Sequence, residues 1–161
     1  MATYTHFAKQ PDVLKHLILC EVLKNETPQV YVETNSACAI YPMTQTPEQQ
    51  YGIYHFLEKA DETPSLKDSI YYQLESGEMA KGNYLGSPAL AMNVLGKQAK
   101  RFVFFDLEKS ALKNVGTYAK QIGLSASVEI HHTDSSRGTI ELLPSLPTSS
   151  FIHIDPYEID K

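Results

Sequence analysis

The sequence predicts an α/β protein built on an open, parallel β-sheet of about four strands, with a small helical segment after the first strand. Four short apolar runs are rich in β-branched and aromatic residues and are bounded by polar or turn-forming residues, as buried strands are. These runs span residues 29–33, 101–106, 127–131 and 150–155. Helical patterns lie between them, and strands that alternate with helices favour a parallel sheet with right-handed crossovers.

Three helical patterns support this alternation, over residues 12–24, 108–122 and 137–143. In the first, Val13, His16 and Cys20 recur at three- and four-residue steps, which is typical of a helix with one buried face. Pro11 stands just ahead as a helix-start signal. Gly123 follows the second pattern, where a glycine commonly ends a helix.

The helical segment after the first predicted strand covers residues 47–81. Its aromatic residues and leucines, among them Tyr51, Tyr54 and Leu57, fall at helical spacing. We expect a helical insertion within a single domain that spans residues 1–161. The aromatic stripe is explained either by ordinary core packing or by a surface that faces a substrate.

Length and composition bound the class of protein. The chain has 161 residues, of which 42% are hydrophobic, and this is enough to form one domain with a core. The 20% share of charged residues argues against disorder. The longest apolar runs are far shorter than the roughly 20 residues that cross a bilayer, and a basic-then-apolar leader is absent from the N-terminus. We expect a cytoplasmic protein without a membrane partner. Cys20 and Cys38 have no metal-binding spacing and are expected to be buried thiols.

The net charge of −5 bears on the partner. A protein that holds nucleic acid through phosphates normally shows a basic face, because counterion release supplies most of that affinity. The acidic balance alone therefore leans against a nucleic-acid substrate.

Polar residues follow each predicted strand, where ligands of open parallel sheets bind. Glu33 ends the first strand, and small residues without glycine follow it at 34–39. They form either a tight turn under an adenosyl ligand or a plain strand-to-helix turn. Asp106 ends the second strand, where a carboxylate accepts ribose hydroxyls or faces a helix N-terminus. Asp134 and Ser135 follow the third, where they accept an adenine amine or cap a helix.

The fourth strand is followed by the most specific feature, Asp155-Pro156-Tyr157. Methylation of a weakly nucleophilic exocyclic amine requires an acceptor for the N–H, a rigid loop and a stacking surface. Asp155 can take the proton, Pro156 stiffens the loop, and the Tyr157 ring can stack on a base. The alternative is an ordinary Asp-Pro turn. His16 either packs in the core or lines the same cleft, and His153 is expected to pack or pair within its strand.

With these elements in order, the chain resembles the bacterial family of 23S ribosomal RNA adenine-N6 methyltransferases known as RlmJ. The matching stretches are Tyr4 with His6, the Asp-Val-Leu-Lys-His of residues 12–16, residues 31–39, the Tyr-Leu-Gly-Ser-Pro of residues 84–88, residues 104–107 with Asp134, and the Ile-Asp-Pro-Tyr-Glu of residues 154–158. The order of these stretches is more distinctive than any one of them.

The resemblance implies a Rossmann-like class I methyltransferase fold, S-adenosylmethionine as cofactor, and RNA as the substrate, methylated at an exocyclic amine such as adenine N6. No metal is implied. Carried over by position, the cofactor contacts are His16, Asn35, Ser87, Asp106, Asp134, Ser135 and Asp155. Asp155 is the catalytic acceptor in a loop with Pro156 and Tyr157, and Tyr4 is a substrate contact.

The chain departs from the family in ways that favour a second reading. Asn35 replaces a histidine, Ser36, Cys38 and Ala39 replace glycines, and the fourth motif lacks one proline. Of the family's seven strands, ordered three-two-one-four and onward, we find the first four, which leaves the fourth as an apolar edge. We therefore expect either a fragment or an edge covered by a second copy or another partner. The alternative function is a catalytically silent or truncated relative that acts as a cofactor-binding or protein-interaction module.

Overall fold

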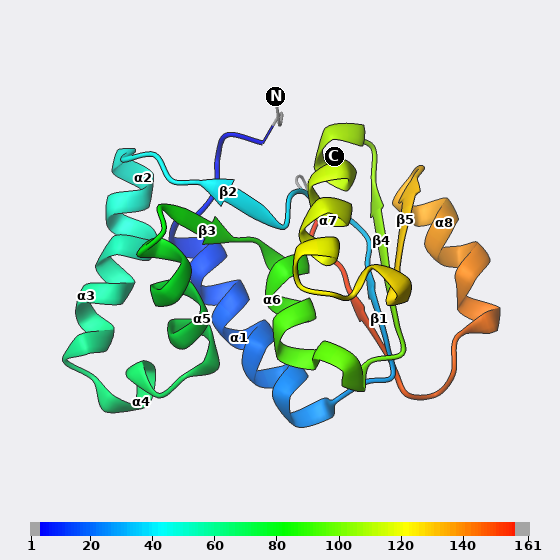
Figure 1. The fold of residues 1–161 in the computed structure, drawn as a ribbon, viewed down its shortest axis with the longest axis horizontal. Helices are drawn as coiled ribbons and strands as arrows, with labels where there is room; N and C mark the ends of the chain where they lie inside the picture. The colour runs from blue at the N-terminus through cyan, green and yellow to red at the C-terminus, as the bar shows by residue number, and fades with distance from the viewer. Residues whose placement is uncertain (1–3, 157–161) are drawn as a thin grey trace.

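A computed structural model describes residues 4–156 (Figure 1). Tyr157, the last residue of the predicted catalytic loop, lies outside these residues. The main sheet within this range has four parallel strands: β1 (Val30–Glu33), β4 (Arg101–Asp106), β5 (Val128–His132) and β6 (Ser150–His153). They are ordered β5-β4-β1-β6. The predicted parallel sheet is confirmed, and its order is the one that the resemblance implies.

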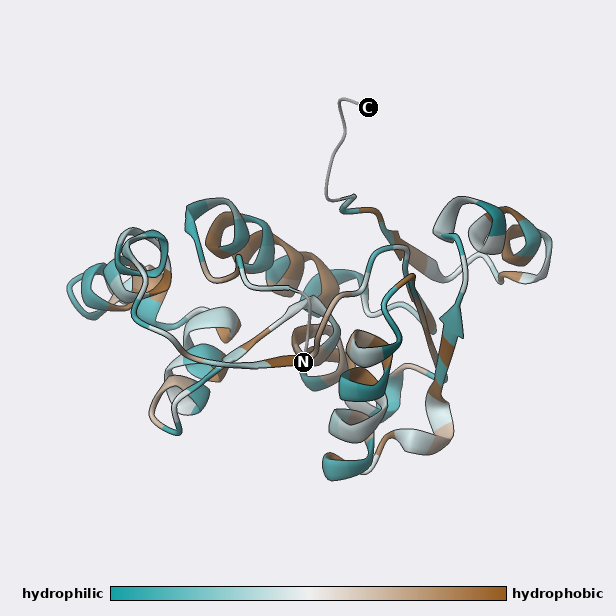
Figure 2. Ribbon diagram, turned by 90° about the horizontal axis from the view of Figure 1, so that it is seen from above, coloured by the Kyte–Doolittle hydropathy of each residue, from teal (hydrophilic) through white to brown (hydrophobic). Residues whose placement is uncertain are grey.

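Helices cover both faces of this sheet. On one face α1 (Gln10–Glu26), α6 (Ser87–Leu95) and α7 (Lys109–Gln121) pack over Tyr31, Phe102 and Phe104. On the other face the segment with α8 (Ser135–Leu142) packs over Val103 and Phe105. Figure 2 shows the strands between α8 and the other helices. All four residues of β1 are buried, as expected of a central strand covered on both faces.

The segment predicted to be a helical insertion is helical. It contains α2 (Pro47–Gln49), the π-helical turn η1 (Gln50–Tyr54), α3 (His55–Asp61), α4 (Pro64–Lys67) and α5 (Ile70–Met79). Its aromatic stripe divides between core and surface, since Tyr71 is fully buried whereas Tyr51 is 71% exposed. Whether the segment is an insertion into a methyltransferase sheet stays a prediction.

Two strands and one helix near the carboxyl ends of the main sheet were not predicted from the sequence. An antiparallel pair, β2 (Ile40–Pro42) and β3 (Asn83–Leu85), closes the helical segment at its base. Each strand has only three residues, too few to show an alternating pattern. Helix α6 is buried on nearly every side, so it also lacks an amphipathic pattern. Together β3 and α6 fix the position of Gly86 and Ser87.

The boundaries of the predicted strands and helices differ from the observed ones by at most two residues. Strand β6 ends at His153, so Asp155 lies in the loop after the strand rather than at its last position. Helix α1 begins at Gln10, which places Pro11 in its first turn. Both cysteines are buried and free, as predicted. Within residues 4–156, no helix has the length and apolar character needed to cross a membrane.

Candidate functional site

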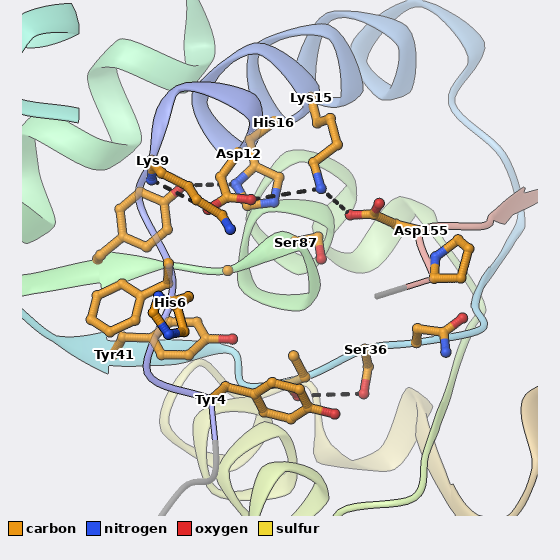
Figure 3. A pocket seen from close by; sticks show the side chains of 16 residues that line it. Tyr4, His6, Lys9, Asp12, Lys15, His16, Ser36, Tyr41, Ser87 and Asp155 are labelled. Carbon is orange, nitrogen blue, oxygen red and sulfur yellow. Dashed lines mark hydrogen bonds and ion pairs between the residues drawn. The ribbon is translucent and has the colours of Figure 1, made fainter. Parts of the chain in front are cut away.

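A cavity of about 210 Å³ lies at the carboxyl ends of β1 and β6 (Figure 3). Four separate parts of the chain line it: the N-terminal segment with the first turns of α1, the loop after β1, the β3–α6 junction, and the loop after β6. It brings together six of the residues singled out from sequence: Tyr4, His16, Asn35, Ser87, Asp155 and Pro156.

The loop after β1 is shaped by a left-handed residue. Ala37 has φ of 50°, a conformation that favours glycine, and it lines the cavity. Its backbone N–H donates to Asp106 Oδ2 at 2.8 Å, which holds the loop against the end of β4. The glycine-free loop therefore makes the tight turn with an alanine, whose methyl group takes room that a glycine would leave open.

Asp106 lies behind the cavity and is already fully engaged. It is 4% exposed and accepts hydrogen bonds from the backbone N–H groups of Ala37 and Glu108, both at 2.8 Å. The Tyr4 hydroxyl lies 3.0 and 3.2 Å from its two carboxylate oxygens. Burial and the nearby Asp106 carboxylate raise the pKa of Tyr4, so this hydroxyl stays a donor. The Tyr4 hydroxyl therefore occupies the Asp106 carboxylate alongside the two backbone donors.

His16 satisfies both interpretations that its sequence position left open. It is buried in the core and also lines the cavity. Its Nδ1 atom lies 2.8 Å from the Tyr84 hydroxyl, and the two rings stack at 6.0 Å. Burial lowers its pKa to about 3, with a smaller contribution from His153, so the imidazole is neutral near pH 7.

Asp155 is held by an ion pair that the sequence analysis did not predict. The Lys15 ammonium donates to Asp155 Oδ2 at 2.6 Å and lies 3.6 Å from Asp12 Oδ1. Burial raises the pKa of Asp12, although Lys15 opposes that shift. Lys15 lies in the second turn of α1, and its ammonium reaches the loop that follows β6.

A second network missed from sequence lies beneath the cavity and centres on Glu33. This side chain is fully buried, with the Tyr31 hydroxyl donating to Oε2 at 3.0 Å and the Ser87 hydroxyl donating to Oε1. His153 Nδ1 lies 3.4 Å from Oε1, so His153 pairs with a side chain of the neighbouring strand β1. Burial lowers the pKa of His153, but the bond to Glu33 and the charges of Glu33 and Asp155 outweigh it, and the net shift is upward.

The third-strand residues are not brought into the cavity that residues 4–156 define. Asp134 caps α8, accepting from the Arg137 backbone N–H at 3.0 Å, and is exposed. Ser135 is the first residue of the same helix. Asp134 therefore caps a helix, as one of its two interpretations predicted, and its contact with an adenine stays a prediction. No group of three or more His, Cys, Asp or Glu side chains within the described range is arranged to hold a metal ion.

The arrangement defines an α/β protein whose parallel four-stranded sheet, flanked by helices, is consistent with a Rossmann-like fold. No protein-family model and no curated protein matches the chain. Among solved structures, it is similar to the crystal structure of protein LPL1258 from Legionella pneumophila, described with the family model DUF519. The two share 27% sequence identity with a TM-score of 0.77 over 94% of this chain. This chain spans 58% of that protein's length.

Proposed function

We propose that this chain is an S-adenosylmethionine-dependent methyltransferase domain that acts on an exocyclic nucleobase amine, adenine N6 in RNA. The observation that supports this most is the cavity itself. Six residues that the family resemblance implicates come from four distant parts of the chain and line one cavity at the carboxyl ends of the central strands.

The cavity fits the cofactor in part. At about 210 Å³ it is smaller than the roughly 300 Å³ at which small-molecule pockets begin, and it suits the amino-acid end. Asp106, the proposed ribose acceptor, lies behind Tyr4. The nucleoside end would therefore require the Tyr4 hydroxyl to leave Asp106.

The proposed chemistry needs little beyond positioning. The cofactor supplies an electrophilic methyl group, and the attacking amine must be aligned with it and relieved of a proton. Asp155 is the acceptor in this proposal, and Pro156 stiffens its loop. The ion pair with Lys15 holds the Asp155 carboxylate at the cavity and keeps a positive charge next to it. Lys9 and Lys15 line the cavity together with the carboxylates of Asp12 and Asp155, so both signs of charge are present there.

Calorimetry with S-adenosylhomocysteine tests cofactor binding. The folded wild-type chain should bind, and Asp106→Asn should bind at least about tenfold more weakly, since it loses a charged acceptor. Asp61→Asn, a surface aspartate paired with Lys67, is the matched control and should bind as wild type does. A folded wild-type chain that does not bind would refute the proposal.

Methyl transfer is tested separately with adenine-containing RNA and S-adenosylmethionine, followed by mass spectrometry of the digested nucleosides. N6-methyladenosine should form with wild type and be lost in Asp155→Asn. Methylation of another base, or none in a chain that binds cofactor, would contradict the proposed substrate.

One observation favours the alternative, a module that binds cofactor or protein without catalysis. Strand β6 pairs only with β1 among the described residues, and Ile18 and Ile154, which line a groove beside this edge, are 54% and 68% exposed. In this alternative a second copy or another partner covers the edge. Light scattering together with the methyl-transfer assay distinguishes the two functions. The module is favoured if the wild-type chain forms an oligomer, Ile18→Asp dissociates that oligomer, and the chain transfers no methyl group.

A further inference from the structure

The hydrogen of the Ser87 hydroxyl is committed away from the cavity. Ser87 is 8% exposed and lines the cavity, but its hydroxyl donates to Glu33 Oε1 below it. A serine hydroxyl has one hydrogen to donate and two lone pairs that accept. With the hydrogen on Glu33, only the lone pairs are left to meet a ligand.

Glu33 is positioned to keep that hydrogen. Its carboxylate is completely buried, and it is absent from the cavity lining that residues 4–156 define. Tyr31 donates to its second oxygen, and His153 approaches the oxygen that Ser87 uses. Ser87, Tyr31 and His153, which contact the carboxylate, are all potential donors, and this is the pattern that an ionised, acceptor-only carboxylate requires.

We propose that Glu33 is a positioning residue that makes Ser87 a hydrogen-bond acceptor, so that this part of the cavity binds the ammonium group of a ligand's amino-acid end and not its carboxylate. This inference rests on the proposed function, since the ligand is the amino-acid end of the proposed cofactor. The negative charge of Glu33 beneath Ser87 adds attraction for a cation, because a buried charge is poorly screened.

The other side of the cavity complements this assignment. Lys9 and Lys15 bring ammonium donors to the lining, and Figure 3 shows both on the α1 side of the cavity. A ligand carboxylate finds its partners there, although Lys15 also pairs with Asp155. The cavity thus offers an acceptor at Ser87 and ammonium donors at Lys9 and Lys15, with the Asp12 carboxylate 3.6 Å from Lys15 Nζ, and the acceptor and donors match the zwitterionic end of an amino acid.

Calorimetry with three ligands tests the inference: S-adenosylhomocysteine, its analogue without the α-amino group, and its analogue without the carboxylate. Wild type should bind the desamino analogue at least about tenfold more weakly than the parent, the scale of one charge-assisted hydrogen bond. In Glu33→Gln the side-chain amide can donate to Ser87, which frees the serine hydrogen to turn toward the cavity. The preference for the amino group should then fall to within about twofold. Glu141→Gln, an exposed glutamate paired with Arg137, is the matched control and should keep the preference.

Ser87→Ala covers the case in which Glu33→Gln does not fold, and it should also lose the preference for the amino group. Removal of the carboxylate should lower the affinity equally in wild type and both variants, because the partners of the carboxylate lie on the α1 side. If wild type binds the parent and desamino ligands equally, or Ser87→Ala keeps the preference, the inference is wrong while the proposed function stands. If the folded wild type binds none of the three ligands, the proposed function fails and the inference fails with it.

Discussion

Tyr4→Phe removes one hydroxyl and should change both the stability of the fold and the affinity for the ligand, in opposite directions. The Tyr4 hydroxyl donates to Asp106 at 3.0 and 3.2 Å, and a bond to a charged acceptor contributes about 1.5 to 3 kcal/mol when well shielded. Tyr4 is only partly buried, and Asp106 keeps the backbone donors of Ala37 and Glu108. We therefore expect a loss of about 1 kcal/mol in the free energy of unfolding.

The same change should strengthen ligand binding. A ribose that binds Asp106 must first displace the Tyr4 hydroxyl, so removing this competitor should raise the affinity for S-adenosylhomocysteine by about fivefold, the equivalent of about 1 kcal/mol. Urea denaturation measures the first effect and calorimetry the second. Tyr72→Phe, which removes an exposed hydroxyl bonded to Asp61 at 2.8 Å, is the matched control for both. A Tyr4→Phe chain that is less stable but binds no more tightly would refute Asp106 as the ribose acceptor.

Three further predictions follow from backbone strain, burial and protonation. Ala37→Gly should stabilise the chain by about 0.5 kcal/mol, because the relief of left-handed backbone strain exceeds the entropy that glycine loses on folding. The variant should also bind S-adenosylhomocysteine more tightly; denaturation measures the first effect and calorimetry the second. Gly86→Ala would place a methyl group 2.2 Å from the Cys38 carbonyl oxygen, so we expect a loss of more than about 2 kcal/mol, seen as a lower melting temperature. His153 has a raised pKa, so its pairing with Glu33 stabilises the fold below the unfolded pKa of 6.5 and is lost as pH rises through the folded pKa. His153→Gln should therefore cost more stability near pH 6 than near pH 9, by about 1 kcal/mol; equal losses at both pH values would contradict the pairing.

The sequence was sufficient for the main sheet because its strands are short apolar runs between clear turn signals. All four strands and the helices α1, α7 and α8 form within two residues of the predicted positions. The pair β2–β3 and helix α6 were not predictable in the same way. Three-residue strands carry no periodicity, and a helix buried on nearly every side looks like any apolar run. Their place depends on tertiary contacts, such as the hydrogen bond from the Gly86 N–H to the Ala39 carbonyl at 2.8 Å.

For the candidate site, the sequence indicated which residues follow the strands but not how they pair. Tyr4 and Asp106 are 102 positions apart, and Lys15 and Asp155 are 140 apart, so neither pair leaves a local pattern. Glu33 was noted as an acid at the end of a strand, and its hydrogen bond with Ser87 depends on the β3–α6 junction, which was not predicted. A charged residue in an otherwise apolar buried strand requires partners, and this requirement was the one usable signal.

A crystal structure of the chain with S-adenosylhomocysteine tests the central claim most directly. The proposal predicts the ligand at the carboxyl ends of β1, β4 and β6, with its ribose hydroxyls on Asp106, the Tyr4 hydroxyl displaced, and its amino-acid end beside Ser87. A saturated crystal in which Tyr4 still holds Asp106 and the cavity contains no ligand would contradict it.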